Sequence, residues 1–333
     1  MKQALYWKKL KDTSIQCQLC PKFCTLKNNE TGNCRVRKNI DGTLYSLVYA
    51  RPVSAYIDPI EKKPLFHFLP GTTAYSIGTA GCNLHCKFCQ NWSISQANPE
   101  DIPSRELPPE KVVQDAEKNS CSSIAYTYTE PNIFYEYVLD TAKLAKNKGI
   151  KNVMITNAFI NEAPVRELYR YIDAVNIDFK AFDEEFYKEI CDGQLKPILK
   201  AIKLIKKTGA WMELTNLVIP TLNDDIKKIK QLCIWIKENL GKDTPLHFSR
   251  FFPDYMLRNL PPTKPETLNK IYETAKDAGL NHVYIGNMIT DKESTFCPRC
   301  GTPVIKRFGF QILENKLKKG KCPCGEKIAG IWE

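Results

Sequence analysis

The sequence predicts an α/β protein built around a full or partial (β/α) barrel, with a small cysteine-rich module at each end. Three observations lead to this prediction. Apolar, β-branched runs alternate with amphipathic stretches about six times, several of these stretches close on glycine, and both ends of the chain are rich in cysteine, glycine and short turns. Repeated strand–helix alternation implies parallel strands joined by helical crossovers. The number of units fits a barrel better than an open doubly wound sheet.

Seven candidate strands mark the central region of the chain. In a barrel, the carboxyl ends of parallel strands meet at one rim, and catalytic residues gather there. The candidate strands are TAYSIGT (73–79), SIAYTYT (123–129), NVMIT (152–156), AVNIDF (174–179), MELTNLVI (212–219), LHFSRF (246–251) and a weaker run that begins at His282.

Five amphipathic stretches between these runs are predicted to be helices. Glycine just after a helix is a stop signal, and it occurs here at Gly149, Gly209, Gly241 and Gly279. The predicted helices cover residues 108–119, 132–149, 195–209, 224–241 and 264–279.

The two ends of the chain are expected to form separate modules, at residues 1–50 and 291–333, on either side of a barrel at 51–290. Segments of about 40 residues seldom bury enough apolar surface to fold alone, so bound metal is expected to stabilise them. No apolar run is long enough to cross a bilayer, and the N-terminus lacks the apolar core of a signal peptide. We therefore expect a cytoplasmic protein with reduced thiols and no membrane partner.

The composition is that of a globular protein, with 43% hydrophobic and 26% charged residues and a formal net charge of +11. That charge counts every cysteine as neutral, and thiolate–metal sites would lower it to roughly +6. The lysines are scattered over helix-like segments, which favours solvated helix faces. Nucleic acid is therefore not expected as a partner.

Eleven of the fourteen cysteines fall into three tight clusters with the spacing of metal ligands. The other three, Cys121, Cys191 and Cys233, stand alone and are expected to be small buried hydrophobic residues. The chemistry of the protein is therefore sought in the clusters.

The central cluster, GCNLHCKFCQNW, follows the first predicted strand and places Cys82, Cys86 and Cys89 at C-x3-C-x2-C. Three thiolates on a loop suit a 4Fe–4S cluster that keeps one iron open. That iron can bind the amino and carboxylate groups of S-adenosylmethionine. An electron from the reduced cluster then cleaves the sulfonium C–S bond and yields a 5′-deoxyadenosyl radical. The alternative is a zinc site that borrows His85 or His67 as its fourth ligand.

The CNLHCKFCQ motif resembles the signature of the radical S-adenosylmethionine superfamily, with the aromatic residue Phe88 before the last cysteine. Four further stretches resemble pyruvate formate-lyase-activating enzymes: DPIEKKPLFHFLPG (58–71), YTEP (128–131), NIDFKAF (176–182) and LVIPTLND (217–224). With its cysteine-rich ends, the chain looks closest to the radical enzyme of the AmmeMemoRadiSam system. The resemblance spans almost the whole chain and implies a partial (β/α) barrel of the radical SAM type.

The resemblance also implies which residues bind S-adenosylmethionine. Relatives carry a Gly-Gly-Glu-type segment that meets the methionine amine, and TYTEP stands there in this chain, so Glu130 matches and the glycines are absent. Asp178 and Lys180 match a D-x-K, whose lysine can pair with the cofactor carboxylate. A rim ion pair between these two residues is the alternative. The further candidates at the rim are Phe88, Thr156, Asn157, Asn216 and His247, with a structural role favoured for His247.

The C-terminal cluster reads CPRCG and then CPCG, two cysteine pairs about 20 residues apart, which is typical of zinc-ribbon knuckles. A structural zinc is therefore expected at Cys297, Cys300, Cys322 and Cys324. A ribbon that contacts nucleic acid through basic residues such as Arg299 is the alternative.

The N-terminal cluster is a C-x2-C-x3-C-x9-C arrangement. Four thiolates fit either zinc or a second 4Fe–4S cluster, and the spacing differs from the tight ferredoxin run, which favours zinc by a small margin. The four residues are Cys17, Cys20, Cys24 and Cys34.

The sequence thus predicts a radical S-adenosylmethionine enzyme that abstracts a hydrogen atom from an unidentified protein or small-molecule substrate. Activation of a glycyl radical protein is the first subclass, and modification of another protein or a small molecule is the second. The expected partners are S-adenosylmethionine and an electron donor such as a ferredoxin or flavodoxin. A non-catalytic zinc or iron–sulfur module acting on RNA or a partner protein is the alternative class.

Overall fold

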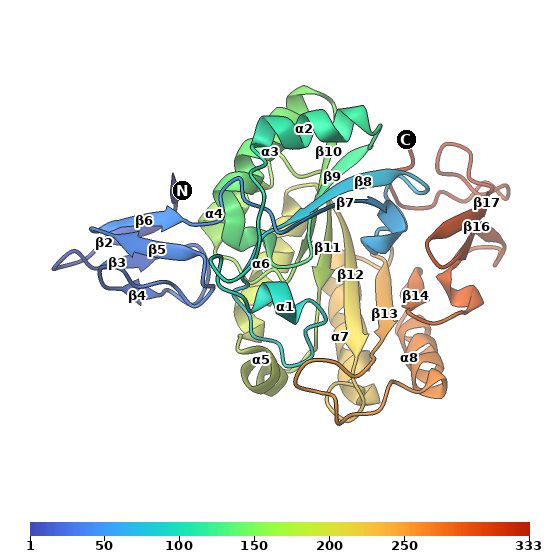
Figure 1. Ribbon diagram of the computed structural model, residues 1–333. Helices are drawn as coiled ribbons and strands as arrows, with labels where there is room; N and C mark the ends of the chain where they lie inside the picture. Colours follow the sequence, from blue (N-terminus) through green and yellow to red (C-terminus); the bar gives the residue numbers. More distant parts are fainter.

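The computed structural model describes residues 1–333, and its centre is one eight-stranded sheet (Figure 1). The strand order is β14-β13-β12-β11-β10-β9-β8-β7, and the two outer strands do not pair with each other. Strands β8 to β14 run parallel, whereas β7 pairs antiparallel with β8. The strands are β7 (Ser54–Pro59), β8 (Thr73–Gly78), β9 (Ser123–Tyr126), β10 (Lys151–Thr156), β11 (Ala174–Asp178), β12 (Trp211–Val218), β13 (Leu246–Arg250) and β14 (Val283–Gly286). The predicted α/β partial barrel is confirmed, and β7 is the strand that the sequence did not reveal.

Helices connect the strands and cover the outside of the sheet (Figure 1). All five predicted helices are present. Helices α1, α4 and α5 are additional, with only four, seven and eight residues, which is too short for a clear periodic pattern. None of the helices has both the length and the apolar composition that crossing a bilayer requires. The helices are α1 (Trp92–Ser95), α2 (Pro109–Lys118), α3 (Tyr135–Asn147), α4 (Glu162–Leu168), α5 (Glu184–Cys191), α6 (Leu195–Lys207), α7 (Ile226–Leu240) and α8 (Pro265–Asp277), with 3-10 turns η1 (Ile60–Lys62), η2 (Pro131–Phe134) and η3 (Asp291–Glu293).

Helix α6 shows how the sequence encodes these crossovers. Its apolar residues recur every three or four positions, so they share one face, while the lysines occupy the other. The buried residues of α6 are Leu195, Ile198, Ala201, Ile202 and Ile205. Burial of this face against the core stabilises the helix more than its intrinsic propensity does.

Strand β9 ends three residues before the sequence predicts. Tyr128 has a left-handed backbone (φ 67°), which a strand does not accommodate. A neighbouring glycine permits this turn, because a Cβ atom at Gly78 would lie 2.6 Å from the Thr127 carbonyl oxygen. The segment from Thr127 to Glu130 is therefore a loop at the carboxyl end of the sheet.

The N-terminal region forms two antiparallel three-stranded sheets. A buried ion pair joins this region to α3: Arg37 Nη1 lies 3.0 Å from Glu136 Oε1. The same carboxylate accepts a hydrogen bond from the Leu5 backbone N–H at 2.8 Å. Removing one partner of such a pair leaves an uncompensated buried charge. One sheet contains β1 (Lys2–Gln3), β6 (Thr43–Ser46) and β5 (Arg37–Ile40); the other contains β2 (Trp7–Lys9), β3 (Ile15–Cys17) and β4 (Thr25–Leu26).

The C-terminal region contains a third small sheet, of β15 (Thr295–Phe296), β16 (Pro303–Phe308) and β17 (Gln311–Asn315). His67 ties it to the barrel, because its Nδ1 lies 2.6 Å from the Ala329 carbonyl oxygen and its Nε2 lies 2.5 Å from the Tyr284 hydroxyl. Its own backbone N–H donates to Glu213 at 2.7 Å. The division of the chain into modules at 1–50, 51–290 and 291–333 stays a prediction.

A pH-dependent stability is expected from His282, whose ring lies 4.5 Å from that of His67. Burial lowers the pKa of His282 to about 3. Because its pKa is higher in the unfolded chain, this residue destabilises the fold as the pH drops from 6.5 towards 3. Between pH 6.5 and pH 5 its share of the unfolding free energy should fall by about 2 kcal/mol.

Urea unfolding of the wild type and of His282→Asn at both pH values measures this effect. The variant should lose less stability on acidification than the wild type by that amount. Equal losses in the two proteins would contradict the prediction.

Candidate active site

The three central cysteines line one cavity of about 220 Å³ at the carboxyl ends of the parallel strands. Cys82, Cys86 and Cys89 lie on the loop between β8 and α1. Five of the residues predicted from the sequence line the same cavity: Phe88, Glu130, Asn157, Asp178 and Lys180. They come from four separate stretches of the chain, and the sheet brings them together.

Hydrogen bonds hold the cysteine loop in place. The Leu84 N–H lies 3.5 Å from Cys82 Sγ, and the Ser95 hydroxyl lies 3.2 Å from Cys89 Sγ. The backbone N–H groups of His85 and Lys87 donate to carbonyl oxygens at the end of α5, each at 2.9 Å. The loop is therefore anchored to both α1 and α5.

The three sulfur atoms are not spaced for a single ion. No three metal-ligand atoms at this site lie within 4.8 Å of one another, whereas those of the C-terminal cysteines do. His85 bonds with Gln96 and Asn33, and neither His85 nor His67 lines the cavity. The arrangement thus fits a larger iron–sulfur cluster with three thiolate ligands better than a zinc ion with a borrowed histidine.

Cys191 lies beside Cys86, a contact that the sequence did not reveal. A hydrogen bond from Cys191 lowers the pKa of Cys86, and the Lys180 ammonium acts in the same direction. Cys191 is buried, as the sequence predicted, but it belongs to the surroundings of the site. Only the packing of α5 against the cysteine loop creates this neighbour.

Glu130 is buried at the inner wall of the cavity. Its Oε1 accepts hydrogen bonds from the Asn132 N–H at 3.0 Å and the Thr156 hydroxyl at 2.7 Å. Its Oε2 accepts one from the Asn157 N–H at 2.8 Å. Burial raises the pKa of Glu130 to about 7. Since a carboxylate oxygen has two acceptor sites, Oε2 can accept one more donor from the cavity.

Thr156 is the last residue of β10 and Asn157 follows it, but the two side chains have different surroundings. Thr156 is buried and does not line the cavity. Asn157 lines it, and its Nδ2 donates to Asn83 Oδ1 at 2.9 Å and lies 3.9 Å from Cys82 Sγ. Asn157 thereby connects the Glu130 carboxylate to the cysteine loop.

Asp178 and Lys180 face the cavity at the end of β11. Lys180 Nζ lies 3.3 Å from Asp178 Oδ2 and 5.6 Å from the centre of the Phe88 ring. Burial alone would lower the pKa of Lys180, but the Asp178 carboxylate and Cys86 hold it well above its usual value. A permanent positive charge therefore stands beside the cysteines.

Asn216 and His247, the weaker candidates, do not line the cavity. Asn216 Nδ2 donates to the carbonyl oxygens of Phe179 and Lys180, at 2.9 and 3.0 Å. His247 Nε2 lies 2.7 Å from Glu213 Oε2, and both side chains are buried. The hydrogen-bond partners of both residues indicate structural roles. For His247, a structural role is the alternative that the sequence favoured.

The cavity also contains residues that the sequence did not single out, including Tyr128, Thr215 and Ser249. The Tyr128 hydroxyl donates to Asp58 Oδ2 at 2.5 Å, and Lys63 Nζ lies 2.7 Å from the same oxygen. Asp58 and Lys63 belong to the 58–71 stretch that resembles the activating enzymes. That resemblance was the sequence signal that could have indicated these partners of Tyr128.

The N-terminal cysteines surround a small enclosed cavity of their own. Cys17, Cys20, Cys24 and Cys34 all line it, together with Phe23 and Asn83. No three of their sulfur atoms lie within 4.8 Å of one another. This spacing is wider than one tetrahedral ion requires.

The C-terminal cysteines are close enough for one metal ion. All four sulfur atoms lie within 4.8 Å of one another. The Sγ atoms of Cys297 and Cys324 are 3.7 Å apart, as are those of Cys300 and Cys322. Sulfurs at about 2.3 Å from a tetrahedral zinc ion would be about 3.8 Å apart. Hydrogen bonds from Thr302 lower the pKa of Cys300 to about 6, which favours the thiolate that a metal binds.

Comparison with known proteins agrees with this geometry. Residues 76–233 match the family model of the radical SAM superfamily. The chain is 45% identical over 332 residues to the uncharacterized protein MJ0808 of Methanocaldococcus jannaschii, covering 98% of this chain and 99% of that protein. It is 24% identical over 211 residues to the pyruvate formate-lyase-activating enzyme of Clostridium pasteurianum, covering 59% of this chain and 87% of that enzyme.

A solved structure shows the same fold. The crystal structure of Streptococcus suis SuiB bound to S-adenosylmethionine superposes with a TM-score of 0.51 and 15% identity, over 68% of this chain and 53% of SuiB. With residues 76–233 as its radical S-adenosylmethionine domain, and with homology to the pyruvate formate-lyase-activating enzymes, the chain is an enzyme of that type.

Proposed function

We propose that this enzyme binds a catalytic 4Fe–4S cluster through Cys82, Cys86 and Cys89 and binds S-adenosylmethionine next to it. The observation that supports this best is the convergence of three cysteines, without a fourth protein ligand, beside an anionic and a cationic side chain. When bound, the reduced cluster supplies the electron that cleaves the cofactor into methionine and a 5′-deoxyadenosyl radical. Superfamily membership favours catalysis over the alternative of a non-catalytic module.

The chain contributes binding and orientation around the cofactor. Lys180 supplies a positive charge for the cofactor carboxylate, and Glu130 Oε2 supplies an acceptor for its amine. Asn157 and Thr156 position the Glu130 carboxylate through their hydrogen bonds. Phe88 and Leu217 give the cavity apolar walls that exclude water.

The test is product analysis under anaerobic conditions. Reconstituted protein reduced with dithionite should convert S-adenosylmethionine into 5′-deoxyadenosine and methionine. Protein that carries the cluster but forms neither product would contradict the proposed function.

Lys180→Met should weaken cofactor binding while leaving the cluster in place. Loss of a charged hydrogen bond costs about 1.5–3 kcal/mol, which corresponds to an increase in Kd of about tenfold to a hundredfold. Isothermal titration with S-adenosylmethionine measures the Kd, and iron content measures the cluster.

Lys188→Met on α5 is the matched control, because Lys188 is well exposed and pairs only with Glu189. It should bind the cofactor as the wild type does. Glu130→Gln should also weaken binding, but it replaces an acceptor with a donor inside a buried network, so its thermal stability must be measured as well. Unchanged cofactor affinity in Lys180→Met would leave this lysine as one half of a rim ion pair.

The substrate class is proposed from the resemblance. The motifs near Asp58, Glu130 and Asp178 support the pyruvate formate-lyase-activating enzyme group, and the cysteine-rich ends support its branch that contains the radical enzyme of the AmmeMemoRadiSam system. The similarity to a putative glycyl-radical enzyme activating enzyme of M. jannaschii, 29% over 223 residues, supports a protein as the first substrate class. A small molecule is the second. A ferredoxin or flavodoxin is the proposed electron donor, and the cytoplasm the proposed location.

The metals at the two ends are also proposals. Sulfur separations of 3.7 Å support zinc at the C-terminal cysteines. At the N-terminal cysteines, the wider spacing supports a second 4Fe–4S cluster over the zinc that the sequence spacing favoured.

A further inference from the structure

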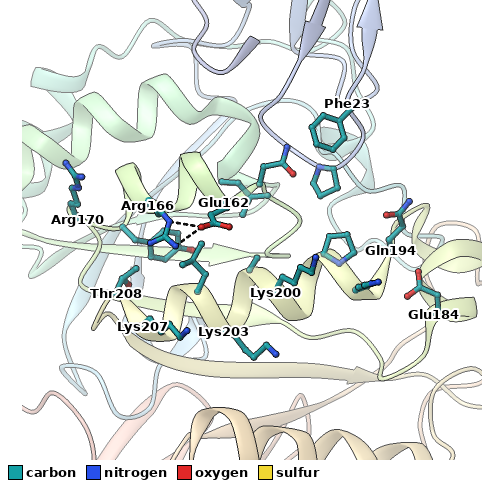
Figure 2. Close-up of a pocket in the computed structure, with 18 residues that line it drawn as sticks. Phe23, Glu162, Arg166, Arg170, Glu184, Gln194, Lys200, Lys203, Lys207 and Thr208 are labelled. Atoms are coloured by element: carbon teal, nitrogen blue, oxygen red, sulfur yellow. Dashed lines mark hydrogen bonds and ion pairs between the residues drawn. The ribbon is translucent and has the colours of Figure 1, made fainter. Parts of the chain in front are cut away.

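A long groove on the outside of the barrel is lined mainly by α4, α6 and the N-terminal cysteine loop. Its volume is about 1290 Å³, and Figure 2 shows Phe23 at the edge nearest the N-terminal module and the lysines of α6 along its floor. Six cationic and two acidic side chains line it, an excess of four positive charges. The cations are Arg166, Arg170, Lys196, Lys200, Lys203 and Lys207.

The positive charge of this basic groove is mostly unpaired. Only Arg166 has a carboxylate partner, Glu162 at 2.6 Å. The four lysines lie three or four residues apart on the exposed face of α6, where like charges repel one another and destabilise a helix. A bound acidic partner would neutralise these lysines and so remove their mutual repulsion. A helix face that only contacts solvent would gain nothing from collecting like charges.

The basic groove meets the N-terminal cysteine site. Pro21 and Phe23, which stand between Cys20 and Cys24, form one edge of the groove, and Phe23 also lines the four-cysteine cavity. Phe23 is 46% exposed, so its ring is accessible to a partner in the groove. A partner in the groove would therefore contact the loop that carries these cysteines.

The N-terminal cysteine site in turn touches the catalytic loop. A Cβ atom at Gly81 would lie 2.4 Å from the Cys34 carbonyl oxygen, so the two backbones are in direct contact one residue before Cys82. Asn83, one residue after Cys82, lines the four-cysteine cavity. The basic groove thus borders the N-terminal cysteine site, and the N-terminal cysteine site contacts the loop of the catalytic cysteines.

We propose that the basic groove is the docking surface for an acidic electron-transfer protein of the flavodoxin class. The inference rests on the proposed function, since only a reductively activated enzyme needs such a partner. In each encounter the anionic flavin hydroquinone becomes the neutral semiquinone, and an oxidised iron–sulfur centre of this protein gains the electron. Opposite charges on the two surfaces speed association and set the orientation of the complex.

The test measures cleavage of S-adenosylmethionine with two different reductants, in the wild type and in a variant whose groove lysines are replaced by glutamates. Lys200→Glu/Lys203→Glu should slow cleavage of S-adenosylmethionine driven by flavodoxin, its reductase and NADPH by at least about tenfold. Cleavage driven by dithionite should stay at the wild-type rate, because a small reductant needs no docking surface. Direct titration should show weaker binding of reduced flavodoxin, and added salt should weaken wild-type binding more than that of the variant.

Lys227→Glu/Lys230→Glu is the matched control, since it makes the same charge change on the exposed face of the neighbouring helix α7. It should behave as the wild type with both reductants. Equal flavodoxin binding and equal flavodoxin-driven rates in the groove and control variants would overturn the proposal. So would loss of binding to a single-stranded RNA or to anionic vesicles in the groove variant with flavodoxin binding intact. Absence of cleavage by the wild type with dithionite would instead refute the proposed function, and the titration would still decide the docking surface.

Discussion

Cys86→Ala is expected to abolish the conversion of S-adenosylmethionine into 5′-deoxyadenosine and methionine. Cys86 lines the cavity between the other two cysteines of the loop and beside Lys180. Without its thiolate the loop keeps only two ligands for the proposed cluster, which is too few to hold it. Product formation should fall at least about a thousandfold, as expected when an essential catalytic group is removed. Liquid chromatography of the anaerobic reaction measures both products.

Cys233→Ala provides the control for this variant. Cys233 is a lone buried cysteine on α7 and does not line the cavity, so the control should keep wild-type activity and iron content. Circular dichroism should show an intact barrel in both variants. Undiminished cleavage by Cys86→Ala would refute the assignment of the catalytic cysteines.

Cys300→Ser is expected to unfold the C-terminal module locally. The zinc ion proposed for this site would supply most of the folding free energy of such a small unit. The module's own core is limited to four buried residues: Cys297, Val304, Cys322 and Ile328. Hydrogen exchange should rise over residues near 291–333, while strands β8 to β14 stay protected. Protection of the module equal to that of the wild type would contradict a structural metal at this site.

Metal analysis of the triple variant Cys82→Ala/Cys86→Ala/Cys89→Ala distinguishes the metals bound at the N-terminal and C-terminal cysteines. The catalytic cluster is then absent, so about one zinc and about four iron atoms per chain are expected. About two zinc atoms and no iron would instead place zinc at the N-terminal cysteines as well. Chelation of zinc from the wild type should reproduce the local unfolding of Cys300→Ser.

Much of the fold could be predicted from the sequence because its signals are local. The apolar faces of α6 and α7 repeat at helical spacing, and β8 to β14 are short apolar runs at the predicted places. Helices α4 and α5 were missed because seven or eight residues show no clear period. Strand β7, SAYIDP, was missed because it is short, its residues show no alternation of buried and exposed positions, and it ends at a proline.

The candidate site was predictable where a motif carries the chemistry. The cysteine spacing at 82, 86 and 89, and Glu130, Asp178 and Lys180 at strand ends, indicated residues that line one cavity. Tyr128 lies in the YTEP stretch (128–131) but was not singled out as a cavity residue, and Cys191 was expected only to be a small buried hydrophobic residue. Their roles depend on a left-handed turn and on the packing of α5, and no short stretch of sequence encodes either feature.

By itself, the sequence determined the α/β class, the order of strands β8 to β14 with the longer helices between them, and the three cysteine clusters, because hydrophobic periodicity and ligand spacing are local features of the chain. Only the tertiary structure decided that Asn216 and His247 turn to structural partners. It also decided that scattered lysines of α6 join Arg166 of α4 and Arg170, just after α4, in one basic groove. It also brought Cys34 against Gly81. These contacts join residues tens of positions apart, and their geometry follows from how strands and helices pack, which no local pattern specifies.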